Sequence, residues 1–196
     1  MEIRRAVPAD EDALYNVALL TGDGGADGTG LFDDPRLLGE IFVGPYLHLE
    51  PDFAYSIDVE GIAGYLLGCL DTRTLESRCA ETWWPVLRAR YPLDVPRRES
   101  DQELVQYIHA PEDRPDALVD SYPSHLHIDL VPRAQGRGYG PQLLQHLLDR
   151  LAQAGSHGVH LGVAAENHRA QKVYRSLGFT DWQRSDSELI MVRTLP

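Results

Sequence analysis

A short glycine-rich segment between an apolar run and a leucine pattern most strongly constrains the fold of this chain. Residues 135–140 read Gln-Gly-Arg-Gly-Tyr-Gly and follow the run His-Ile-Asp-Leu-Val-Pro at residues 127–132. Leucines at helical spacing come next, at Leu143, Leu144, Leu147, Leu148 and Leu151. This order predicts a strand, a glycine turn and a helix. Because the first N–H groups of a helix lack partners and its dipole favours anions, we expect a phosphate-binding loop.

The glycine spacing excludes two common phosphate loops. A P-loop ends in Gly-Lys-Ser/Thr, whereas proline and glutamine follow Gly140 here. The dinucleotide fingerprint, counted from Gly136, would need its third glycine at Pro141. The spacing that fits is Gln-x-x-Gly-x-Gly, carried by Gln135, Gly138 and Gly140.

A second motif follows after one helix and one strand. Residues 159–164 predict that strand, and the next segment fits Asn-x-x-Ala-x-x-x-Tyr-x-x-x-Gly-Phe at Asn167, Ala170, Tyr174, Gly178 and Phe179. Together the two motifs resemble the GCN5-related N-acetyltransferases (GNAT), which use acetyl-CoA. The resemblance is firm over residues 126–179, compatible over 1–70 and weak over 72–124.

The resemblance implies acetyl-CoA as the cofactor and assigns its contacts. The pyrophosphate is expected against Gln135, Gly136, Arg137, Gly138, Tyr139 and Gly140. The pantetheine arm is expected where the fourth strand bulges and splays from the fifth, beside free backbone groups of Leu130 and Val131. Asn167 is expected to hydrogen-bond this arm, Ala170 to leave room for it, and Lys172 to reach a phosphate.

Two residues are candidates for proton transfer to and from the reacting groups. Tyr174 matches the family's general acid, although its helical spacing would also bury it for packing alone. Asp129 lies closest to the expected bulge, where a carboxylate could take the amine proton through water or steady the ammonium. A purely structural role for Asp129 remains an equal alternative.

Strand alternation places His125, His127 and Asp129 on one face of their strand. We expect both histidines to pack or face solvent rather than act as bases. A metal site built from His127, Asp129 and a distant histidine is an alternative that leaves both motifs unexplained. A calcium reading of the loop at residues 22–34 is disfavoured, because Gly25 occupies a ligand position and glutamate is absent from the last one.

The composition of the chain limits the classes of partner that it is expected to bind. The formal net charge of −12 argues against nucleic acid and is compatible with a basic acceptor. Basic residues nevertheless gather around the two motifs, as a polyanionic cofactor requires: Arg133, Arg137, Arg169, Lys172 and Arg175. Lacking an apolar span or signal segment, the chain is expected to be cytoplasmic, without a membrane partner, and a monomer or homodimer. Cys69 and Cys79 are expected to be free thiols, with Cys69 in the core.

The resemblance and the hydrophobic pattern predict one α/β (α+β) domain over residues 1–196 with the GNAT fold. We expect a single mixed, mostly antiparallel, twisted sheet flanked by helices, with a helical insertion at residues 72–124 between strands three and four. The other expected strands cover residues 2–7, 53–59, 62–70, 180–183 and 188–195. Asp10 is expected to cap a helix ending at Leu20, and residues 35–43 to form another.

The insertion is the least familiar part of the chain. We expect helices at residues 72–90 and 101–109, a proline-broken connector between them, and a loop at 111–123. The insertion would either cover the sheet or form a lid over the acceptor.

Residues 122–130 and the insertion resemble the acetyltransferase-like domain of O-GlcNAc hydrolases and its free-standing bacterial relatives. No glycosidase part is shared, so no sugar hydrolysis is expected. The function expected is N-acetyl transfer to a small-molecule or peptide amine by direct attack in a ternary complex. The alternative is an acetyl-CoA-binding module that senses or scaffolds without turnover.

Overall fold

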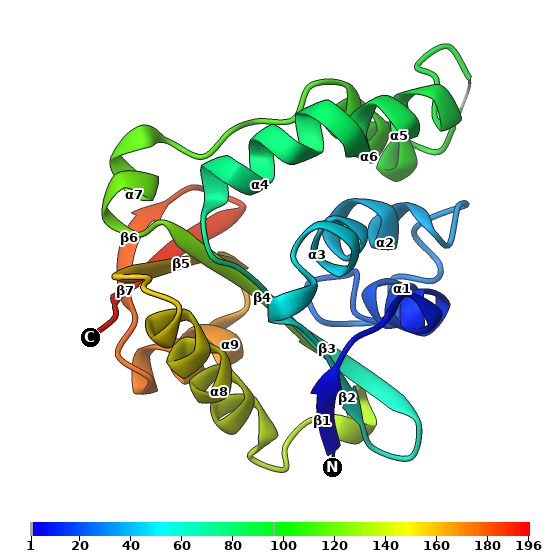
Figure 1. The fold of residues 1–196 in the computed structure, drawn as a ribbon. Coiled ribbons are helices and arrows are strands. Elements are labelled where there is room, and N and C mark those ends of the chain that lie inside the picture. Colours follow the sequence, from blue (N-terminus) through cyan, green and yellow to red (C-terminus); the bar gives the residue numbers. More distant parts are fainter. Residues whose placement is uncertain (1, 96) are drawn as a thin grey trace.

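The computed structural model describes residues 2–95 and 97–196, whose strands form a seven-stranded sheet. Its strand order is β1-β2-β3-β4-β5-β7-β6, and every neighbouring pair is antiparallel except the parallel pair β4–β5 (Figure 1). The strands are β1 (Glu2–Arg5), β2 (Ala54–Asp58), β3 (Ile62–Cys69), β4 (Ser124–Leu130), β5 (Gly158–Ala164), β6 (Thr180–Arg184) and β7 (Glu188–Thr194). The mixed, mostly antiparallel sheet expected from the sequence is confirmed.

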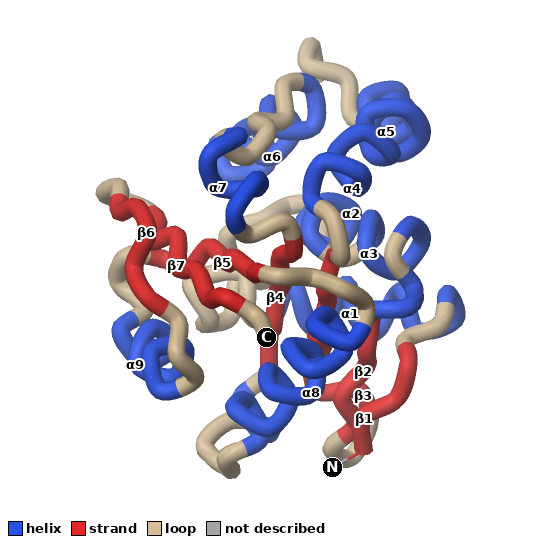
Figure 2. Tube along the Cα trace, turned by 60° about the vertical axis from the view of Figure 1, so that its left-hand side comes forward, coloured by secondary structure: helices blue, strands red, loops and turns tan. Residues whose placement is uncertain are grey.

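Helices cover both faces of this sheet. They are α1 (Glu11–Leu20), α2 (Leu37–Phe42), α3 (Gly44–Leu49), α4 (Thr72–Arg78), α5 (Trp84–Arg90), α6 (Glu99–His109), α7 (Asp116–Ser121), α8 (Tyr139–Gln153) and α9 (His168–Ser176). The core splits accordingly: α1 to α6 contribute to one hydrophobic cluster, and α8 and α9 contribute to the other. Figure 2 shows α4 to α7 gathered at the end of the molecule opposite the N-terminus.

The predicted strand, glycine turn and helix are present. The predicted leucines of α8 are all buried, because their spacing turns them to one side of the helix, against the sheet: Leu143, Leu144, Leu147, Leu148 and Leu151. Pro132, which has no N–H to continue a strand ladder, opens a short 3-10 turn one residue after β4. Gly138, at a φ of 76°, then precedes the first residue of α8.

Strand β4 leaves its parallel neighbour early. It pairs with β3 from Cys69 opposite His125 to Gly64 opposite Leu130. With β5 it pairs only at Ser124 and His125, so residues 126–130 border an opening in the sheet. The expected splay between the fourth and fifth strands is therefore present, but β4 keeps a regular register with β3 from His125 to Leu130, so the expected bulge is absent there.

The helical insertion between β3 and β4 is confirmed, with one correction near its C-terminal end. Residues 72–90 are helical throughout, since a π-turn at Cys79–Trp83 joins α4 to α5. The predicted loop at 111–123 contains α7. This helix has six residues, which is too short for its hydrophobic residues to show a helical repeat in the sequence. Helix α3 was not predicted; it carries Pro45 in its first turn, where proline is tolerated.

The expected cap at the first helix is wrong. The side chain of Asp10 makes no cap bond to α1. It accepts hydrogen bonds from the Val7 N–H and from both terminal nitrogens of Arg4, which tie the end of β1 to the start of α1. Cys69 and Cys79 are both free and buried. Within the described residues, no helix combines the length and apolar character that membrane crossing requires.

Candidate functional site

A cavity of about 580 Å³ lies where β4 and β5 part. Its wall combines the end of β4, the glycine loop, the starts of α8 and α9, and a loop after α1. The lining residues are Thr21, Gly24, Gly25, Ala26, Ile128, Asp129, Leu130, Ala134, Gln135, Gly136, Gly138, Tyr139, Gly140, Pro141, Leu144, Asn167, Arg169, Ala170, Val173 and Tyr174. Two motifs separated by a helix and a strand in the sequence therefore meet around one space.

The glycine loop presents backbone to this cavity. Gly136 and Gly138 have φ values of 72° and 76°, a region that residues with a side chain rarely adopt. No atom lies within 4 Å of a Cβ built at Gly136, Gly138 or Gly140, so the loop is bare toward open space. Tyr139 and Gly140 are the first residues of α8, so their N–H groups have no partner within the helix. An anion placed here would meet backbone donors and the positive end of the helix dipole.

Gln135 fastens the loop to its neighbours. Its side-chain amide donates to the Leu130 carbonyl at 2.6 Å, and its Oε1 accepts from Arg169 at 3.1 Å. Its own backbone N–H is used in the turn, where it donates to the Pro132 carbonyl. The contribution of Gln135 is therefore to hold the loop against the end of β4 and the start of α9.

Of the two backbone N–H groups expected at the splay, those of Leu130 and Val131, only one points toward the opening. The Val131 N–H donates to the Ala63 carbonyl of the neighbouring strand, so it is not available to a ligand. Hydrogen-bonded and non-bonded pairs alternate along an antiparallel ladder. Since Val131 opposite Ala63 is a bonded pair, the preceding residue, Leu130, turns its N–H away from β3 and toward the opening.

The second motif contributes less polar contact than expected. The Asn167 oxygen accepts from the Ala170 N–H and caps α9, and its amide donates to the Gly24 carbonyl across the cavity. Ala170 lines the cavity as expected. Lys172 does not, because helical spacing puts it on the opposite side of α9 from Ala170 and Tyr174.

The basic residues that the sequence places around the two motifs make different contacts in the structure. Arg133 donates to carbonyls at Val59 and Ile62, and Arg175 pairs with Asp181. Arg137 is exposed and outside the cavity wall. Arg169 does line the cavity and takes the position that the sequence suggested for Lys172.

Asp129 lies in this cavity next to a residue that the sequence did not reveal. Tyr65 of β3 is opposite Asp129 in the sheet, and its hydroxyl donates to Oδ2 at 2.5 Å. Burial raises the pKa of the Asp129 carboxyl to about 6, and the Tyr65 hydrogen bond opposes part of that rise. Asp129 is therefore mostly ionised at neutral pH but holds its proton more firmly than an exposed aspartate. Only the register between β3 and β4 makes Tyr65 its partner.

Tyr174 approaches the same space from α9. Its side chain is buried against Phe179 and lines the cavity. Burial raises the pKa of its hydroxyl far above the usual value, and the nearby Asp129 charge adds to the rise. The phenol consequently keeps its proton at all physiological pH values and can serve as a hydrogen-bond donor or an acid, not as a base.

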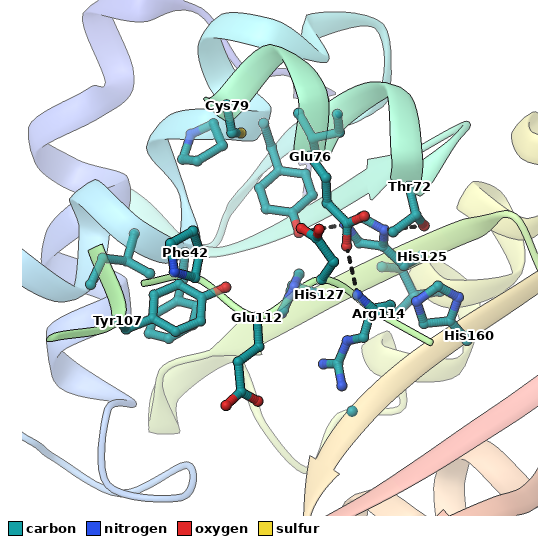
Figure 3. A pocket seen from close by; sticks show the side chains of 18 of the residues that line it. Phe42, Thr72, Glu76, Cys79, Tyr107, Glu112, Arg114, His125, His127 and His160 are labelled. Atoms are coloured by element: carbon teal, nitrogen blue, oxygen red, sulfur yellow. Dashed lines mark hydrogen bonds between the residues drawn. The ribbon is translucent and has the colours of Figure 1, made fainter. Parts of the chain in front are cut away.

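The two histidines predicted beside Asp129 line a second, smaller cavity of about 160 Å³ (Figure 3). His125 is held by Tyr46 at its Nε2 and by Thr72 at its Nδ1. His127 and Asp129 belong to different cavities, and residues 2–95 and 97–196 contain no cluster of three potential metal ligands. The metal and calcium alternatives thus find no support in the described part of the chain.

Comparison with known proteins agrees with this geometry. The model of the acetyltransferase (GNAT) family matches residues 50–179. The chain is 27% identical over 182 residues to protein O-GlcNAcase of Rattus norvegicus, and 26% identical over 180 residues to that of Mus musculus. These alignments include 90% of the chain, which spans about a fifth of the length of the curated relatives it matches.

Solved structures share the architecture. The crystal structure of SsHAT superposes with a TM-score of 0.90 at 34% identity, covering 98% of this chain and 97% of that one. Naa20 of Chaetomium thermophilum, solved in complex with a bisubstrate analogue, gives a TM-score of 0.57 at 19% identity over 100% of this chain and 87% of that one. The second likeness concerns the fold alone.

Proposed function

The chain belongs to the acetyltransferase (GNAT) family, and from this premise we propose that it moves the acetyl group of acetyl-CoA to an amine by direct attack. The observation that carries the proposal is the cavity between β4 and β5. There a bare glycine loop, an ionisable carboxylate and a protonated phenol surround one space. Acetyl-CoA supplies the activated thioester; this chain supplies position, proton transfer and exclusion of water.

The loop and the splayed strand are suited to hold the donor. The backbone amides at Gly138, Tyr139 and Gly140 would bind the pyrophosphate, with Arg169 adding charge. Leu130 would offer its N–H to the thioester oxygen, where negative charge develops during attack. Fixing the donor in this way removes much of the entropy cost of bringing two reactants together.

Asp129 and Tyr174 would move the protons. An alkylammonium with a pKa of about 10 is not nucleophilic until it loses a proton. Asp129 would accept that proton, directly or through water, while the amine nitrogen bonds to the acetyl carbon. As the carbon–sulfur bond breaks, the Tyr174 hydroxyl would protonate the departing thiolate of coenzyme A.

The competing function is a module that holds acetyl-CoA without turnover. It would need the loop but not the pairing of Asp129 with Tyr65 or the buried phenol of Tyr174. The cavity contains one group that can accept a proton, Asp129, and one that can donate a proton, Tyr174, and this combination favours the enzyme.

The test uses the purified chain with acetyl-CoA and a panel of primary amines, following release of the coenzyme A thiol. Calorimetry with coenzyme A alone measures binding separately. Thiol release that depends on the amine supports the enzyme, and tight binding without release for any amine favours the module. Absence of binding heat and of a rise in melting temperature would refute the assignment of the cavity.

A further inference from the structure

The smaller cavity and the larger one have neighbouring residues of β4 in their walls. Leu126 and His127 line the smaller cavity, whereas Ile128 and Asp129 line the larger. His127 and Asp129 are on the same face of the strand, two residues or roughly 7 Å apart. With space for a chain of several atoms, about 160 Å³, the smaller cavity is placed to receive a molecule whose reactive end lies at Asp129.

The insertion builds the outer half of this cavity, hereafter the insertion chamber. Aromatic rings form its sides: Tyr107 of α6 stacks on Phe42 at 6.4 Å and meets Trp84 edge-on at 6.0 Å, measured between ring centroids. Tyr46 and His127 lie at the inner end, where their ring centroids are 5.3 Å apart. Such a lining suits methylene groups and, through the ring faces, a nearby cation.

The floor of the insertion chamber is uncharged. Burial lowers the pKa of His127 and of His160 to about 4, and it lowers the pKa of His125 as well, so these imidazoles are neutral at pH 7. His160 holds its Nδ1 against the Tyr122 carbonyl. Neither ring nitrogen of His127 has a hydrogen-bond partner among residues 2–95 and 97–196, and Figure 3 shows the ring at the chamber wall.

The outer rim, by contrast, is acidic. Glu76 faces the insertion chamber from α4, and Glu112 and Asp113 follow on the exposed segment after α6 (Figure 3). The cation in the wall, Arg114, is already matched, because its guanidinium pairs with both oxygens of Glu188 on β7. Its backbone N–H donates to Glu76. The rim therefore carries unbalanced negative charge in front of a neutral, aromatic throat.

We propose that the insertion chamber selects an acceptor with two positive ends: an aliphatic diamine whose alkyl chain fills the aromatic throat. One amine reaches Asp129, and the second ammonium stays at the rim formed by Glu76, Glu112 and Asp113. This rests on the proposed acetyl transfer and names its substrate class. A neutral tail would leave the rim carboxylates without a counter-ion, and an anionic tail would be repelled by them.

The test measures binding to the complex of the protein with coenzyme A, so that it needs no turnover. Three ligands with the same number of methylene groups are titrated by calorimetry: cadaverine, n-hexylamine, in which a methyl replaces the second ammonium, and ε-aminocaproate. We expect cadaverine to bind about tenfold more tightly than n-hexylamine at low salt and ε-aminocaproate to bind most weakly. The advantage of cadaverine should shrink as salt is raised.

The Glu76→Gln variant localises the effect. The amide oxygen of the introduced glutamine would still accept the Arg114 N–H, so the fold contact is kept while the charge is removed. We expect the preference for cadaverine over n-hexylamine to fall severalfold, and to disappear when Glu112→Gln is added. Glu103→Gln, which removes an exposed charge of α6 outside the chamber, is the matched control and should keep the preference.

Three outcomes would overturn the proposal. One is equal binding of cadaverine and n-hexylamine by the parent protein, and another is an unchanged preference after the double substitution. The third is a lysine residue blocked at both backbone ends binding as tightly as cadaverine, which would point to a protein side chain instead. If Glu76→Gln fails to fold, Glu112→Gln alone, on an exposed segment, still tests the rim. Failure of acetyl transfer with intact diamine preference would reject the proposed function but not the chamber.

Discussion

Replacing Asp129 by asparagine should make the protein more stable while removing its activity. The carboxyl is buried, and burial raises its pKa to about 6. Its ionised form is therefore less favourable in the folded protein than in the unfolded chain. Asparagine has nearly the same shape, carries no charge, and can still accept the hydrogen bond from Tyr65.

The magnitude follows from the displaced pKa. The difference between about 6 in the folded protein and the ordinary aspartate value of 3.8 is roughly two units, and one unit corresponds to 1.36 kcal/mol. Above pH 6 the aspartate should thus cost about 3 kcal/mol of unfolding free energy. Between 3.8 and 6 the folded state holds the proton that the unfolded state loses, so stability falls as pH rises; below 3.8 the cost vanishes.

The assay is urea unfolding of the parent protein and Asp129→Asn from about pH 4 to about pH 8. The difference in unfolding free energy between the two proteins should be near zero at the acidic end and should grow as pH rises toward 6. Above that pH it should level off, with the variant more stable by about 3 kcal/mol. Asp186→Asn, at an exposed site, makes the same charge change and should show no such growth. A difference that stays flat with pH, or a variant less stable at pH 8, would refute the reasoning. Acetyl transfer should fall about a hundredfold or more.

Other variants test the remaining parts of the site. Gly138→Asp should abolish coenzyme A binding in calorimetry, because a carboxylate would enter the phosphate cradle. Gly155→Asp, also at positive φ and facing open space but beyond the far end of α8, should bind normally, and equal affinities for both would reject the loop assignment. Tyr174→Phe should slow turnover roughly a hundredfold with unchanged cofactor affinity, and a full-rate variant would remove the acid role. Gln135→Ala frees the loop from Leu130 and Arg169, so coenzyme A affinity should fall about tenfold; an unchanged affinity would show that the loop holds its shape alone.

Local periodicity explains why much of the site could be predicted. Asp129 shares a face with two histidines because strands alternate, and Tyr174 faces inward because helices repeat every three to four residues. The glycine loop was recognisable because only glycine takes its backbone angles freely. The same reasoning misplaced Asp10, whose carboxylate found stronger partners in Arg4 and Val7 than in the helix it precedes.

The sequence by itself determined the order of strand, loop and helix, the family motifs and the sides on which their residues lie. Only the tertiary structure decided that Tyr65 meets Asp129 and that the N–H of Val131 is taken by Ala63. It also turned the insertion into one half of a chamber. These features depend on strand register and on packing between segments far apart in the chain, which no local pattern encodes.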